Sequence, residues 1–176
     1  MIRDYLTDII KAKENGAYFS ALALALTIPD VCGKIEGIGE NSREKYIKWF
    51  DKWIYKYFEI PQSENPELSK YDDLLIFDGR VCYALRCAFL HSGNANLKEN
   101  PSLGVKLDRF ELCVCESEWQ GGEGMGCYLS YGEVKETHRR FNVINLLDAF
   151  VMGTEGYIKE CGDTSKQYGD LKIIKF

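Results

Sequence analysis

Apolar residues recur at every third or fourth position through the first half of the chain, and this spacing is typical of α-helices with one buried face. Polar or glycine-containing breaks separate the apolar runs and mark the helix ends. The pattern predicts four helices, over residues 2–14, 17–36, 42–58 and 79–92. The second of these is apolar on all sides, which predicts a central position in the fold.

Two features of this helical half predict local geometry. Pro29 lies inside the second predicted helix, where a proline removes a backbone hydrogen bond and bends the axis. Asn41 or Ser42 suits the N-cap of the third helix. That helix also carries an aromatic stripe made of Tyr46, Trp49, Phe50, Trp53, Ile54 and Tyr57. We expect the stripe to lie in the core or at a dimer face rather than to stack on nucleic-acid bases.

The pattern changes to strand-like runs after the helical half. Strands are predicted over residues 105–115, 126–131 and 138–144. Asn145 is the predicted N-cap of a last helix that runs to about Cys161. Residues 171–176 have the composition of a further short strand.

These elements predict a single, mainly α-helical domain over residues 1–176, with a small antiparallel β-sheet inserted before the last helix. The helical bundle is expected to comprise about residues 1–95 and 145–161, and the sheet about residues 105–144. A chain of 176 residues is long enough to form one such domain around its own core.

Charge and composition limit the classes of function. The net charge of −5 argues against a broad basic face, so DNA is not an expected partner and any RNA contact would be a small local patch. No apolar run reaches the roughly 18–20 residues of a membrane span, and the charged first segment is unlike a signal peptide. Seven cysteines without a framework spacing indicate reduced thiols. We therefore expect a cytoplasmic protein that does not associate with membranes.

A zinc site is one alternative for the predicted sheet. Cys113 and Cys115 would share one face of a strand, Cys127 lies on the next strand, and His138 begins the third. The C-x2-C pairing of structural zinc sites is absent, and buried cysteines also serve as small apolar side chains. We therefore expect neither a metal nor another cofactor.

The segment LRCAFLHSGN, residues 85–94, places Arg86 and His91 near the end of the fourth predicted helix. Five positions along an α-helix correspond to roughly 140° of rotation, so the two side chains meet only if the helix ends near them. One interpretation is structural, because basic side chains are favoured near the carbonyls of a helix C-terminus. The other is catalytic, and a third, a Cys87–His91 nucleophile pair, is disfavoured by the apolar neighbours of Cys87.

The segment DGRVCYALRCAFLHSG resembles the helix that carries the R-x4-6-H motif in the HEPN superfamily of helical-bundle domains. Upstream, ALALALTIPDVCGKIE and REKYIKWFDKW resemble a group of bacterial HEPN-like proteins, and the resemblance spans roughly residues 17–94. Many HEPN domains are dimeric, metal-independent endoribonucleases. The resemblance therefore implies a homodimer, an RNA substrate, and Arg86 with His91 as the catalytic pair.

The resemblance leaves two functions open. Active members often have a polar residue directly after the motif arginine, where this chain has Cys87. The first function is an endoribonuclease of stress response or phage defence, with Asp30, Ser92 and Asn94 as supporting or substrate-binding groups. The alternative is a catalytically inactive HEPN-like module that dimerises or binds a nucleotide or a partner protein.

Overall fold

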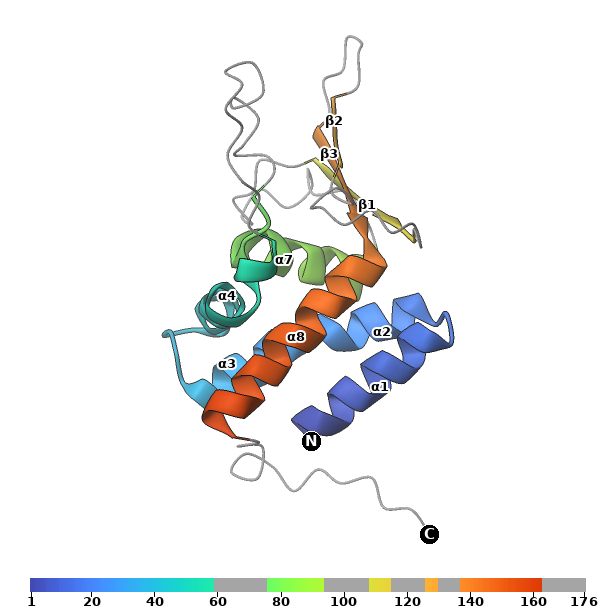
Figure 1. The fold of residues 1–176 in the computed structure, drawn as a ribbon. Helices are drawn as coiled ribbons and strands as arrows, with labels where there is room; N and C mark the ends of the chain where they lie inside the picture. Colours follow the sequence, from blue (N-terminus) through green and yellow to red (C-terminus); the bar gives the residue numbers. More distant parts are fainter. Residues whose placement is uncertain (59–75, 94–107, 115–125, 130–136, 163–176) are drawn as a thin grey trace.

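A computed structural model describes residues 1–58, 76–93, 108–114, 126–129 and 137–162. The described part is mainly α-helical with a small sheet before the last helix, as the sequence predicts (Figure 1). The α-helices are α1 (Ile2–Glu14), α2 (Tyr18–Ala25), α3 (Ile28–Glu36), α4 (Ser42–Trp53), α7 (Gly79–Cys87) and α8 (Val143–Cys161). A short 3-10 helix, η1 (Tyr55–Tyr57), follows α4, and a π-helical turn, η2 (Ala88–Ser92), continues α7.

The apolar segment predicted as one bent helix is two helices, α2 and α3. Pro29 lies in the first turn of α3, where backbone N–H groups have no partner in the helix and a proline is tolerated. The Thr27 hydroxyl donates to the Leu24 carbonyl at 2.7 Å between the two helices. The proline therefore starts a helix here instead of bending one.

By length and composition, one described segment, Tyr18–Glu36, is apolar enough to cross a membrane, contrary to the expectation that no run qualifies. The break between α2 and α3 divides it, and Leu22, Leu26 and Cys32 are buried in the core. Core helices of soluble proteins pass the same test, so a soluble protein is consistent with this segment.

Helix α4 begins as predicted, because the side chain of Asn41 caps it by accepting from the backbone N–H of Glu44 at 3.0 Å. Most of its aromatic stripe is buried, which confirms the core interpretation. Trp49 and Trp53 both pack edge-on against Tyr157 of α8, with ring centroids 5.4 Å apart. The aromatic stripe of α4 therefore packs within the core of this chain.

The sheet is mixed, so the prediction of an antiparallel sheet is wrong in one pair. Its strands are β1 (Arg109–Cys113), β2 (Gly126–Leu129) and β3 (Thr137–Asn142), in the order β1-β3-β2. β2 pairs antiparallel with β3, whereas β1 pairs parallel with β3. Alternation along a strand determines which face is buried but not which neighbour pairs with it, so the sequence pattern could not identify the parallel pair.

Helix α8 begins at Val143, directly after β3, and its N-cap is Asn142 rather than the predicted Asn145. The Asn142 side chain accepts from the backbone N–H of Ile144 at 3.1 Å. Asn145 is instead an exposed residue inside the first turn of α8. The predicted strand at 171–176 lies outside the described residues.

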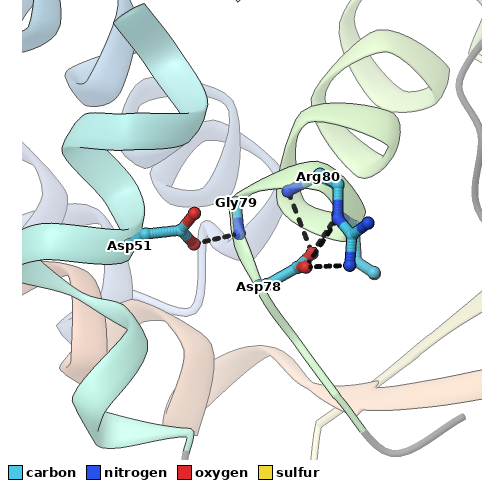
Figure 2. Close-up of polar contacts among 5 residues, drawn as sticks. Asp51, Asp78, Gly79 and Arg80 are labelled. Atoms are coloured by element: carbon cyan, nitrogen blue, oxygen red, sulfur yellow. Dashed lines mark hydrogen bonds and ion pairs between the residues drawn. The ribbon is translucent and has the colours of Figure 1, made fainter. Parts of the chain in front are cut away.

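Two glycines let α3 and α7 approach the backbone of α4. A Cβ atom on Gly33 would lie 2.5 Å from the Lys45 carbonyl oxygen, and one on Gly79 would lie 2.5 Å from the Ile47 carbonyl oxygen. Figure 2 shows the second contact region, where the Asp51 carboxylate accepts from the Gly79 N–H at 2.6 Å. These close approaches bring α3, α4 and α7 together around the candidate site.

Candidate functional site

Arg86 and His91, the predicted pair, are in direct contact. The Nη1 atom of Arg86 lies 2.5 Å from Nε2 of His91. The two residues meet because α7 widens into the π-helical turn η2, in which residues five apart lie one above the other. The sequence suggested that the helix ends between the two residues, but it continues past His91. It stops only at Gly93, which has a left-handed φ of 56°. Single π-helical turns of this kind occur often at functional sites.

The contact also indicates which nitrogen of His91 is unprotonated. A guanidinium group has only N–H donors and no acceptor. Nε2 of His91 must therefore accept from Arg86, which leaves the ring proton on Nδ1. The His91 side chain is exposed, so solvent or a ligand can reach it.

Asp30 of α3 supports Arg86 from the other side. Both Nε and Nη2 of Arg86 lie 3.0 Å from Oδ2 of Asp30, and both side chains are largely covered. Burial raises the pKa of the Asp30 carboxyl, although Arg86 and His91 act to lower it. Burial also acts to lower the pKa of Arg86, but Asp30 and Cys87 outweigh it and the pKa of Arg86 is raised. The predicted supporting role of Asp30 thus has a geometric basis.

Sequence reasoning missed Tyr83, which lies one helical turn before Arg86. The Arg86 guanidinium lies 5.9 Å from the Tyr83 ring centroid, and Arg43 of α4 lies 5.7 Å from it. Burial raises the pKa of the Tyr83 hydroxyl, and the charge interaction with the neighbouring Cys87 raises it further. The spacing of three residues between Tyr83 and Arg86 was a signal that could have identified it, since such residues share a helix face.

Cys87 occupies the position where active HEPN domains often have a polar residue. Its side chain is half-buried, and its proximity raises the pKa of both Arg86 and Tyr83. Cys87 therefore lies next to the polar groups of the site and influences their titration.

A second cysteine, Cys82, lies in the core beneath the site. Sγ of Cys82 lies 3.3 Å from the Tyr46 hydroxyl, and both residues are fully buried. Burial raises the pKa of the Cys82 thiol far above its usual range, so this thiol stays protonated and has a structural role.

The structure does not describe the side chains of two other residues that the sequence singled out, Ser92 and Asn94. Ser92 is the last residue of η2, and its side chain is not described, while Asn94 lies outside the described residues.

The strand register places two of the candidate zinc ligands, Cys113 and His138, far apart. Cys113 lies opposite Asn142, whereas His138 pairs with Arg109, so the two are four residues, or about 13 Å, apart along the sheet. Cys115 lies outside the described residues. Within the described part of the chain, no group of three or more His, Cys, Asp or Glu residues could hold a metal ion.

Comparison of the chain with protein-family models, with curated proteins and with solved structures returned no match. The HEPN resemblance therefore depends on the sequence motif.

Proposed function

We propose that the protein is a metal-independent endoribonuclease that cleaves single-stranded RNA through Arg86 and His91. The observation that carries the proposal is the 2.5 Å contact between Arg86 and His91, supported by Asp30 on the far side of the guanidinium. An imidazole can take up and return a proton near neutral pH, and a guanidinium can bind a phosphate through two parallel hydrogen bonds.

In the proposed reaction, Nη1 of Arg86 transfers its hydrogen bond from His91 to the scissile phosphate. This frees Nε2 of His91, which takes the proton of the ribose 2′-OH. The 2′-oxygen attacks phosphorus, and the bond to the 5′-oxygen breaks as that oxygen takes a proton from solvent, while His91 releases its proton to solvent. Arg86 stabilises the negative charge that accumulates on the phosphate oxygens. The products are a 2′,3′-cyclic phosphate and a 5′-hydroxyl, with no water consumed.

We further propose a cytoplasmic homodimer, following the HEPN resemblance, in which two R-x4-6-H helices face each other. A two-fold dimer would place both exposed His91 side chains in one groove. Light scattering should give about twice the monomer mass of 20.2 kDa. A monomer at micromolar concentration would contradict the composite groove.

The direct test is cleavage of a single-stranded RNA in excess EDTA, with analysis of the product ends. RNA with 2′-deoxy or 2′-O-methyl at the scissile position should resist cleavage. His91→Ala and Arg86→Ala should each lower the rate by roughly 10² or more. Arg80→Ala is the matched control, because this exposed arginine on the same helix pairs with Asp78 and should affect the rate little (Figure 2).

The second candidate is a catalytically inactive HEPN-like module that dimerises or binds a nucleotide or a partner protein. The observation that favours it is that Arg86 occupies the Nε2 lone pair of His91. Under this alternative the wild-type protein cleaves no RNA, and Arg86→Ala lowers the melting temperature because it leaves the half-buried Asp30 without its counter-ion.

A further inference from the structure

The three-helix junction around Arg86 contains a second cation, Arg43, which no part of the proposed reaction uses. Arg43 is half-buried in the first turn of α4, and its guanidinium lies 5.7 Å from the Tyr83 ring centroid. The same ring has the Arg86 guanidinium 5.9 Å away. Two arginines therefore share one aromatic ring, and one of them, Arg86, contacts the exposed His91.

The position of Arg43 is unfavourable for the helix itself. The N-terminus of an α-helix carries partial positive charge, so a cation in the first turn is unfavourable there. Tyr83 offsets part of this cost through a cation–π contact, with its own position fixed by an edge-on contact to the buried Tyr46, 5.3 Å between centroids. The Tyr83 ring thus positions the guanidinium groups of Arg43 and Arg86 next to each other.

Helix packing determines that these groups meet. The close approach at Gly79 seats the start of α7 on the middle of α4, so the antiparallel helices bring the end of α7 to the start of α4. The approach at Gly33 then brings Asp30 of α3 to the same point. This packing therefore brings two guanidinium groups together in a chain whose net charge is −5.

We infer that Arg43 is a second phosphate-binding residue, which contacts a backbone phosphate of the RNA strand flanking the scissile phosphate. The inference rests on the proposed ribonuclease function and specifies its substrate class: an oligonucleotide with at least two phosphates, rather than a dinucleoside monophosphate. Two positioned guanidinium groups match two phosphates of one strand, and such contacts fix the register of the strand without reading its sequence. Tyr83 is a positioning residue for both cations.

The test combines Arg43→Ala with substrate length. Arg43→Ala should lower kcat/KM roughly tenfold or more on a trinucleotide with two phosphates, and should leave kcat/KM on a dinucleoside monophosphate nearly unchanged. Arg43→Lys should retain part of the effect, since lysine keeps the charge but not the bidentate geometry. Arg3→Ala is the charge-matched control, because Arg3 is exposed on α1, which packs against α2 and α8. An equal loss on both substrates, or no loss on either, would overturn the inference.

A binding measurement separates this inference from the ribonuclease proposal. Fluorescence anisotropy with a fully 2′-O-methylated oligonucleotide needs no cleavage. Arg43→Ala should weaken binding and reduce the slope of log affinity against log salt by about one unit, whereas Arg3→Ala should do neither. Binding that depends on Arg43 without any RNA cleavage by the wild type would reject the ribonuclease and keep the phosphate site. RNA cleavage that does not change in Arg43→Ala would keep the ribonuclease proposal and reject the phosphate site at Arg43.

Discussion

Asp30 and Arg86 form an ion pair in which one carboxylate oxygen accepts from two nitrogens of the guanidinium, each at 3.0 Å. The pair joins α3 to α7 and leaves Nη1 directed at His91. The aspartate therefore orients the arginine but does not touch the expected position of the substrate.

This geometry predicts the effect of Asp30→Asn. The amide keeps the shape of the side chain but removes its charge. Arg86 is then held less firmly, and its guanidinium is no longer aligned with His91. We expect a fall in kcat of about tenfold with little change in KM, because a positioning contact acts mainly in the transition state. Steady-state kinetics on one RNA substrate measure both constants. A rate equal to that of the wild type would show that Arg86 needs no support from α3.

Burial of Asp30 also predicts a pH dependence of stability. The folded protein raises the pKa of this carboxyl above 3.8, so between the unfolded and folded pKa values the folded state binds more protons than the unfolded state. The contribution of Asp30 to the free energy of unfolding should therefore be largest below pH 3.8 and should fall as the pH rises through the folded pKa. Asn cannot titrate, so the wild-type stability minus that of Asp30→Asn should decrease from acid to neutral pH. Urea titrations across this pH range would measure this stability difference. An increase of the difference with pH would contradict the raised pKa of Asp30.

The close approach of α7 to α4 predicts a large cost for Gly79→Ala. The added methyl would lie 2.5 Å from the Ile47 carbonyl oxygen and 2.8 Å from the Ile47 Cα, both backbone atoms that cannot rotate away. Separating the two helices should lower the free energy of unfolding by about 1–3 kcal/mol. It should also lower the ribonuclease activity, because α7 carries Arg86.

Gly156→Ala provides the matched control. Gly156 lies inside α8, and an added Cβ would meet no atom within 4 Å. Alanine favours the helix over glycine, so this variant should gain about 0.5–1 kcal/mol. Thermal unfolding of both variants tests the pair, and equal effects would show that the α4–α7 contact is looser than described.

Local patterns in the sequence predicted the helices well, because each depends on residues near in the chain. The apolar spacing predicted α1, and Asn41 marked the start of α4. Pro29 marks a break in the helix, but the predicted bend is wrong, because the proline starts α3. These signals act within one or two turns, so a single sequence contains them.

Features that depend on distant segments were not predictable in the same way. The pairing of β1 with β3 depends on contacts across the fold, which no alternation pattern records. Arg86 and His91 were identified as residues, but the π-helical turn that aligns them was not. Arg43 lies far from both in the chain, and only the packing of α4 on α7 brings it to Tyr83.

The start of α8 gives a stability test that compares two asparagines three positions apart, of which only Asn142 caps the helix. Asn142 caps the helix through a 3.1 Å bond to the Ile144 N–H and is buried, so Asn142→Ala leaves that N–H without its acceptor. We expect a loss of about 1 kcal/mol in the free energy of unfolding. Asn145 is exposed inside the first turn, and alanine has the higher helix propensity, so Asn145→Ala should be neutral or gain a few tenths of a kcal/mol. Chemical denaturation of the two variants compares them directly. If Asn145→Ala were the more destabilising change, the helix would begin at Asn145, and β3 could not run directly into α8 as it does here.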